Sequence, residues 1–261
     1  MKAKWLLSII AVIALVLSVS PDIAFAAESG TSTGTFGCGN SAPNVSAVAL
    51  VDLADVGVTT MTPQVEYNIK VTVSDANTLD DLDTVKVWIY YDADGTFNSS
   101  QKVDPGNTQT GAVLTWTNAT PDTWTIDPAA STTWAIVGGN CSSPALTGSS
   151  GNFQFHFKAG KVATESAGAS EWHIYAVADD GTVTDDAYQE GREMAWYGEI
   201  TVNTATVNWG SVAAGMDFGE DTDSEEGSIS VTYLANGAYD EKIAASETWT
   251  GAPSGTATII P

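Results

Sequence analysis

Acidic residues cluster at several points where apolar runs of this sequence end, and these clusters are best suited to hold a metal ion. Three candidate sets can be drawn from them in chain order. The first set is Asp52, Asp55, Asp92, Asp94 and Asp104; the second is Asp75, Asn77, Asp80, Asp81 and Asp83; the third is Asp179, Asp180, Asp185 and Asp186. Oxygen ligands in loops suit Ca²⁺, which takes about six to eight of them. Ca²⁺ is therefore the candidate cofactor, and a fourth acidic run, DFGEDTDSEE, follows later in the chain.

The stretch YYDADGTF within the first set resembles the start of an EF-hand loop. An EF-hand has glycine at its sixth position and glutamate at its twelfth. Counted from Asp92, Gly95 comes two residues early and Val103 stands at position twelve, so the stretch is not an EF-hand. Asp-Gly pairs also form ordinary hairpin turns. For each acidic cluster, the turn and the metal site therefore remain competing interpretations.

Residues that could carry out catalysis are scarce. His156 and His173 are the two histidines, and they lie on the polar phase of two runs that can pair as a hairpin. No third metal ligand accompanies them, which favours an exposed pair without function. The motifs G-x-S-x-G and H-E-x-x-H are absent, as are phosphate-binding glycine loops. We therefore do not expect an enzyme.

Tryptophan offers a second kind of binding chemistry, because aromatic rings can stack on sugars. The candidates are Trp88, Trp116, Trp124 and Trp134. The competing interpretation is that these large side chains fill or cover the core, as large aromatic residues commonly do. Carbohydrate is one candidate partner on the first interpretation.

The runs between the acidic clusters alternate apolar and polar residues, which predicts β-strands. One face is predicted to carry Val65, Tyr67, Ile69, Val71 and Val73, then Val85, Val87, Ile89 and Tyr91, then Phe153, Phe155 and Phe157, and finally Trp172, Ile174, Ala176 and Ala178. No stretch after the N-terminal apolar run has a convincing helical period. The fold class predicted is all-β: an Ig-like β-sandwich with a long Thr/Trp-rich insertion at 104–150, followed by a second, small or incomplete β unit. If the first two runs form a hairpin, the first candidate set gathers at one end of it.

Four segments are predicted along the chain. Residues 1–27 have the basic start, apolar core and small-residue end of a secretory signal peptide. Residues 28–44 form a flexible leader, residues 45–206 the Ig-like domain, and residues 207–261 a second β unit. That unit is either truncated or completed by a strand from another chain, because an unpaired strand edge invites association. After signal cleavage we expect no membrane insertion, since no second long apolar run occurs.

Charge and cysteine content point to an exported protein. The net charge is −23, and removal of residues 1–27 takes away two lysines and one aspartate to leave −24. Such a surface repels nucleic acid and attracts cations. Cys38 and Cys141 are the two cysteines, and in an exported chain an even number favours a disulfide. Possible glycosylation sites of the form N-x-S/T occur at Asn44, Asn98, Asn118 and Asn140.

Two runs, YNIKVTVSDANTLDDLDTVKVWIYYDADG and WHIYAVADDGTVTD, resemble Ig-like or cadherin-like modules of prokaryotic cell-surface and S-layer-type proteins. The resemblance covers residues 45–205, and Asp75, Asp179 and Asp180 match its turn positions. It implies an extracellular structural or adhesive module, often stiffened by calcium. We therefore expect a secreted cell-surface protein that is structural or adhesive, such as a filament or envelope subunit able to self-assemble. The alternative is a carbohydrate-binding module or a non-catalytic part of a glycan-active enzyme.

Overall fold

The computed structural model describes residues 39–102, 109–127, 134–203, 230–240, 248–250 and 256–258. All the strands belong to one of two compact units, residues 40–261. The predicted signal peptide, Cys38, Asp104 and the DFGEDTDSEE run lie outside the described residues. Within the described ranges, no helix is long and apolar enough to cross a membrane.

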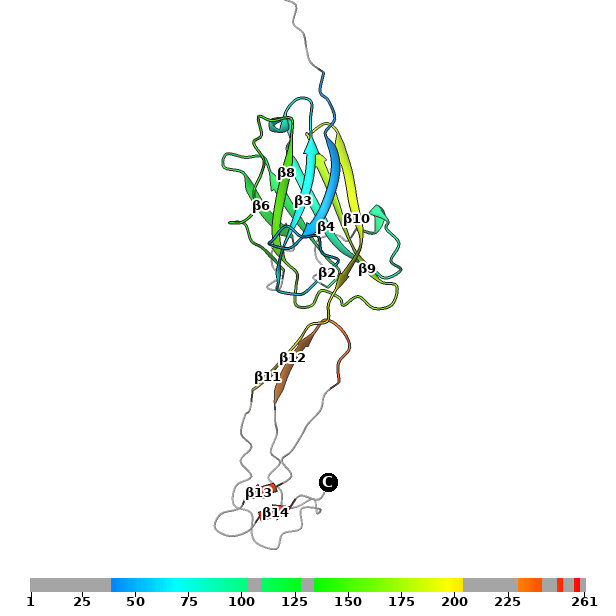
Figure 1. Ribbon diagram of the computed structural model, residues 1–261, viewed down its shortest axis with the longest axis vertical. Helices are drawn as coiled ribbons and strands as arrows, with labels where there is room; N and C mark the ends of the chain where they lie inside the picture. Colours follow the sequence, from blue (N-terminus) through cyan, green and yellow to red (C-terminus); the bar gives the residue numbers. More distant parts are fainter. Residues whose placement is uncertain are drawn as a thin grey trace, which may run out of the picture. The chain divides into compact units, whose positions relative to one another are not determined.

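Most of the strands form two sheets that face each other (Figure 1). The smaller sheet has the order β1 (Asn44–Val51), β3 (Glu66–Ser74), β8 (Ser150–Lys158) and β7 (Ala135–Ile136). The larger has the order β2 (Thr60–Met61), β10 (Thr184–Met194), β9 (Glu171–Asp179), β4 (Thr84–Asp92), β5 (Gly111–Thr117) and β6 (Thr123–Asp127). Neighbouring strands are antiparallel, except that β2 and β10 are parallel.

This strand order is that of a variable-type Ig sandwich. The smaller sheet follows the order A-B-E-D, and the larger follows G-F-C-C′-C″, with β2 added beside β10. The predicted all-β, Ig-like sandwich is confirmed. The Thr/Trp-rich stretch at 104–150 supplies β5, β6 and β7, so its described parts belong to the two sheets themselves.

Apolar side chains at every second position of the strands fill the space between the sheets. Within β3 and β8, Ile69 and Phe155 are fully buried, and Ile89 and Ile174 meet them from the larger sheet in the same apolar cluster. Each strand turns every second side chain inward, so a period of two in the sequence becomes a two-sided core. The predicted inward faces are confirmed except at Val65, which precedes β3 and is 46% exposed.

Two hairpins that the sequence left possible do not form. The run at 65–73 (β3) and the run at 85–91 (β4) lie in opposite sheets, and so do β8 and β9. Both members of each pair face one shared core, and the connections are long enough to cross the roughly 10 Å between packed sheets. Residues 75–83 make the first crossing, held by Leu79 and Leu82, both fully buried.

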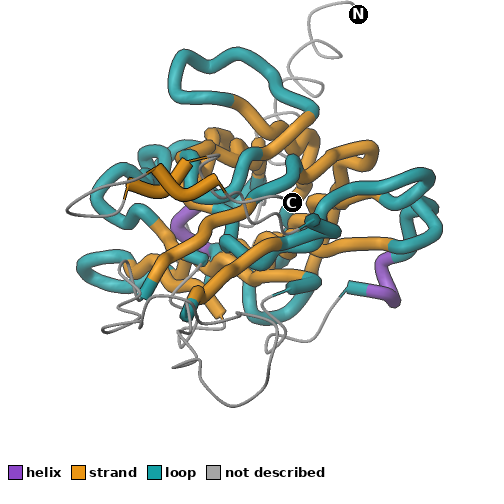
Figure 2. The backbone as a smooth tube through the Cα atoms, turned by 90° about the horizontal axis from the view of Figure 1, so that it is seen from below, coloured by secondary structure: helices purple, strands orange, loops and turns teal. Residues whose placement is uncertain are grey.

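Short elements complete the described chain. The two 3₁₀ turns, η1 (Leu79–Asp81) and η2 (Ser99–Gln101), are the helical pieces in an otherwise strand-and-loop structure (Figure 2). Farther along, β11 (Gly198–Val202) pairs with β12 (Val231–Ala235), and β13 (Thr248–Thr250) with β14 (Thr256–Thr258). The predicted boundary at 206/207 falls outside the described residues, and the β11–β12 pair draws one strand from each side of it.

Candidate metal centre

Asp75 follows the last residue of β3 and is the most deeply buried acid of the site, with 3% of its surface exposed. Its Oδ1 accepts a hydrogen bond of 2.7 Å from the backbone N–H of Asn77. Among the described residues, its Oδ2 has no hydrogen-bond partner. A buried carboxylate oxygen without a donor is costly, so this atom calls for a positive partner.

Asp81 is placed by the 3₁₀ turn η1. Leu79 and Leu82 pack into the core on either side of it, and Asp81 itself is exposed. Thr78, which precedes the turn, has φ of 84°, a conformation that is unusual for a β-branched residue. The apolar anchors thus fix the turn, and its acid is presented at the surface of the same end of the sandwich as Asp75.

Asp180 follows the last residue of β9 and is held by its own turn. Its Oδ1 accepts hydrogen bonds from the backbone N–H groups of Thr182 (2.8 Å) and Val183 (2.7 Å). The hydrogen bond from Val183 is the largest cause that holds the pKa of Asp180 below its usual value, and the bond from Thr182 adds to it. Its Oδ2 accepts a bond of 2.9 Å from Nδ2 of Asn40.

The three carboxylates form one group, because one oxygen from each lies within 4.8 Å of the other two. Ca²⁺–oxygen bonds are about 2.3–2.6 Å, so ligands on opposite sides of the ion are about 5 Å apart. The group therefore has the size of a Ca²⁺ coordination shell. It consists of hard oxygen donors only, which suits Ca²⁺ and is unlike the N and S ligands of zinc.

The second and third candidate sets meet at this end of the sandwich, and each contributes to the group. Other members have structural roles. Asn77 Oδ1 accepts from the N–H of Ser41, Asp179 Oδ1 from that of Gly181, and Asp185 Oδ2 from that of Val45. Asp80, Asp83 and Asp186 are exposed members of the same sets that do not join the group. Asp75, Asp80, Asp81, Asp83 and Asp180 lie between strands, whereas Asp179 ends β9 and Asp185 and Asp186 lie in β10. The sequence indicated two separate sites for these acids.

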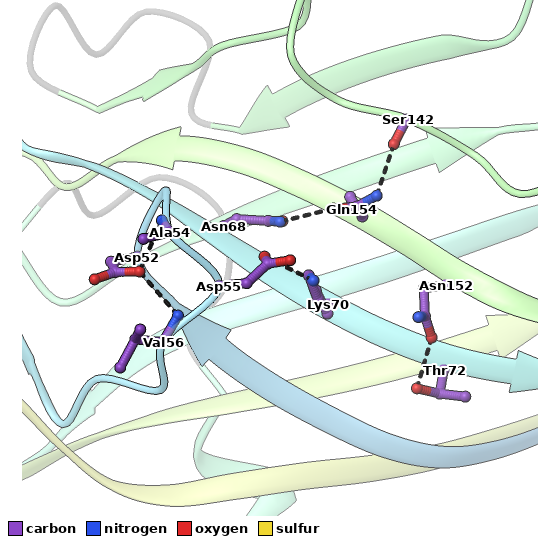
Figure 3. Close-up of polar contacts among 10 residues, drawn as sticks. All are labelled: Asp52, Ala54, Asp55, Val56, Asn68, Lys70, Thr72, Ser142, Asn152 and Gln154. Atoms are coloured by element: carbon purple, nitrogen blue, oxygen red, sulfur yellow. Dashed lines mark hydrogen bonds and ion pairs between the residues drawn. The ribbon is translucent and has the colours of Figure 1, made fainter.

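The described members of the first candidate set, Asp52, Asp55, Asp92 and Asp94, are not brought together. Asp52 accepts bonds from the N–H groups of Ala54 and Val56, and Asp55 forms an ion pair of 2.7 Å with Lys70 (Figure 3). Asp94 Oδ1 accepts from the N–H of Thr96. These acids close their own turns or bind a lysine, as the competing turn interpretation holds.

The histidines lie on opposite outer faces of the sandwich, so they do not form the exposed pair that a hairpin would have made. His156 Nδ1 is 3.0 Å from Oε1 of Glu66 on the smaller sheet. His173 is fully buried on the larger sheet among Tyr90 and Phe97. Because β8 and β9 belong to different sheets, no hairpin brings the two rings together.

Three of the four candidate tryptophans belong to the core. Trp116 and Trp134 are buried, and Trp124 packs edge-on against Phe155. Trp88 is half-buried on the outer face of the larger sheet, where Nζ of Lys102 lies 4.7 Å from its ring centroid. The carbohydrate alternative therefore retains Trp88 alone of its four rings.

Cys141 is the described member of the predicted disulfide, which stays a prediction. Its thiol is half-buried, and burial raises its pKa. Among the glycosylation candidates, Asn118 Nδ2 donates to the carbonyl oxygens of Asp80 and Leu82, and a glycan there would remove one of these bonds. Asn98 is exposed, and its Oδ1 accepts from the backbone N–H and hydroxyl of Ser100.

No protein-family model matches the chain, and no curated protein does either. Two solved structures resemble it. A DUF4466 family protein from Parabacteroides merdae has a TM-score of 0.29 and 14% identity, over 65% of this chain and 50% of that one. The C-terminal fragment of a major pilin of Streptococcus agalactiae has a TM-score of 0.25 and 10% identity, over 61% and 58%. Neither likeness is strong enough to bear on function, and the Ig-type assignment rests on the strand order.

Proposed function

We propose that this protein is a secreted, acidic structural or adhesive module of a cell surface, braced at one end of its sandwich by Ca²⁺. The observation that carries the proposal is the buried carboxylate of Asp75, which forms a group with Asp81 and Asp180 and whose Oδ2 lacks a hydrogen-bond donor among the described residues. A divalent cation would supply the positive partner that this oxygen lacks.

The position of the group favours a brace over catalysis. Asp75 and Asp81 belong to the segment that crosses from the smaller to the larger sheet, and Asp180 follows a strand of the larger sheet. An ion bound to all three would tie the crossing segment to the end of β9. It would also offset mutual repulsion of three carboxylates in a chain of net charge −23.

The same acidity supports a role outside the cell, where millimolar Ca²⁺ sites of modest affinity are useful. The finer proposal is that such modules form part of an envelope or filament through contacts between copies. The carbohydrate alternative would gain support if polysaccharide retained the protein and Trp88→Ala abolished the retention.

Thermal melting of the full-length protein in millimolar CaCl₂ and in EDTA tests the brace. A ligand at about 100 times its Kd that binds only the folded state adds about 2.7 kcal/mol of stability. We expect Ca²⁺ to raise the Tm by several degrees, and MgCl₂ to raise it less, because Mg²⁺ demands a tighter octahedral shell. Equal Tm values in CaCl₂ and EDTA would sink the proposal.

A further inference from the structure

The first residues of the described unit are attached to the candidate metal centre by two hydrogen-bonded routes. We call residues 40–44 the leading segment. In the first route, Nδ2 of Asn40 donates to Oδ2 of Asp180 at 2.9 Å. In the second, Asn77 accepts from the N–H of Ser41 at 2.7 Å, while its own N–H donates to Oδ1 of Asp75 at 2.7 Å. Both routes end on a carboxylate of the metal group.

From this connection we infer that cation binding at Asp75, Asp81 and Asp180 fixes the leading segment on the sandwich, with Asn40 as a positioning residue for the site. The inference rests on the proposed brace and adds what the brace controls. A carboxylate oxygen has two lone pairs, so Oδ2 of Asp180 can bind the ion and accept from Asn40 together. Hydrogen bonds of this kind orient a ligand toward its metal.

Without a bound ion, the site favours release of the leading segment. Three carboxylates with oxygens within 4.8 Å repel one another, and the carboxylate of Asp75 is buried, with no hydrogen-bond donor to its Oδ2 among the described residues. Separation of the crossing segment from the turn at Asp180 relieves this repulsion. The leading segment is bonded to both parts: Ser41 to Asn77 of the crossing segment, and Asn40 to Asp180 of the turn. Separation of the two parts therefore also loosens the leading segment. Binding of the ion and docking of the segment therefore favour each other by the same factor.

The start of β1 offers a matched control. Val45 donates its N–H to Oδ2 of Asp185 at 2.7 Å, and Asn44 Nδ2 approaches the same oxygen at 3.4 Å. Asp185 lies outside the three-carboxylate group. Asn40 and Asn44 are thus exposed asparagines of one segment, each donating to an aspartate, and only the aspartate that Asn40 contacts belongs to the metal group.

The experiment measures the Kd for Ca²⁺ by titration calorimetry on the full-length protein and its N40A and N44A variants. We expect N40A to bind Ca²⁺ about tenfold more weakly, as for other residues that orient metal ligands, and N44A to bind like wild type. In EDTA the two variants should melt alike, which separates an effect on the ion from a general loss of stability.

Hydrogen exchange on the wild type gives a second readout that needs no variant. Added Ca²⁺ should slow exchange at the N–H of Ser41 by about tenfold, and more strongly than at that of Val45. If the wild type binds no Ca²⁺, the proposed brace itself fails. If it binds Ca²⁺ but N40A binds equally tightly and Ser41 exchange is unchanged, the brace stands and this inference is overturned.

Discussion

Oδ2 of Asp92 lies 3.9 Å from Nε2 of His173, and both side chains are buried on the outer face of the larger sheet. The connection between β4 and β5 covers this face, because Phe97 packs against His173 and stacks on Tyr188 at 3.6 Å. Among the described residues, neither that oxygen nor either ring nitrogen of His173 has a hydrogen-bond partner. The covered pair is therefore a cost to stability rather than a support.

Replacement of Asp92 by asparagine should remove part of that cost. The amide keeps an oxygen to accept from the N–H of Asp94, as Oδ1 of Asp92 does at 3.0 Å, and gains a donor that faces His173. We expect D92N to be as stable as wild type or more stable by about 1 kcal/mol, and D92A to lose about 1–3 kcal/mol. Urea unfolding at pH 7 measures both. Equal losses in the two variants would show that Oδ2 has a partner.

Gly95 of the same turn should tolerate no side chain. Its φ is 69°, and a Cβ would overlap the carbonyl oxygen of Ala169. Gly168 has φ of 68° with open space at its Cβ position, so G168A measures the backbone strain alone. We expect G168A to lose about 1–2 kcal/mol and G95A at least about 1 kcal/mol more, from the added overlap. Equal losses in urea unfolding would contradict the close contact with Ala169.

The sandwich was predictable because its signal is local. Alternation in the run from Phe153 to Phe157 shows which side chains face inward, whatever the partner strand. Alternation does not show which strands are neighbours, so it left open a hairpin between the runs at 65–73 and 85–91, which instead face each other across the core. The second candidate set was already drawn around Asp75 and Asp81; what alternation could not show is that Asp180, from the third set, lies beside them.

The residue types of the carboxylate group could be predicted from the sequence, but not which three acids form it. Asp75 and Asp180 both follow a strand, which the turn pattern showed. Their proximity depends on how β3 and β9 are arranged in two different sheets, and no spacing within the sequence encodes that distance. Asn40 was assigned to a flexible leader, because a short polar segment without alternation gives no sign of the aspartate that it contacts.

Trp116 should be the most costly of the four candidate tryptophans to remove. It is fully buried against Phe153, with ring centroids 4.6 Å apart, and its Nε1 donates to Oδ2 of Asp122 at 3.0 Å. We expect W116A to lose about 3–5 kcal/mol, whereas W88A, on a half-buried ring, loses about 1–2 kcal/mol. Urea unfolding compares the two. A loss for W88A as large as that for W116A would show that Trp88 contributes as much to stability as a core side chain.

Glu66 should make stability depend on pH on the acid side. A hydrogen bond from Asn140 is the largest cause that holds its pKa below the usual value, and His156 adds to it. Stability from a carboxylate with a depressed pKa is present above its unfolded pKa, about 4.3, and is lost as pH falls through the folded value. Relative to wild type, E66Q should therefore be less stable at pH 7, and the difference should shrink below about pH 4. Parallel stability curves from pH 7 to pH 3 would rule this out.

Asp75→Asn tests whether the proposed Ca²⁺ binds at the group of Asp75, Asp81 and Asp180 or at the first candidate set. The substitution removes one charge from the group while an amide oxygen can still accept from the N–H of Asn77, so the fold should persist. We expect D75N to lose the Tm increase on addition of Ca²⁺ and to melt in EDTA at or above the wild-type Tm, because repulsion among the carboxylates is reduced.

D94N is the matched control, since Asp94 is an exposed acid whose Oδ1 accepts from the N–H of Thr96. It should keep the full response to Ca²⁺. If D94N loses that response and D75N keeps it, the ion belongs at the other end of the sandwich.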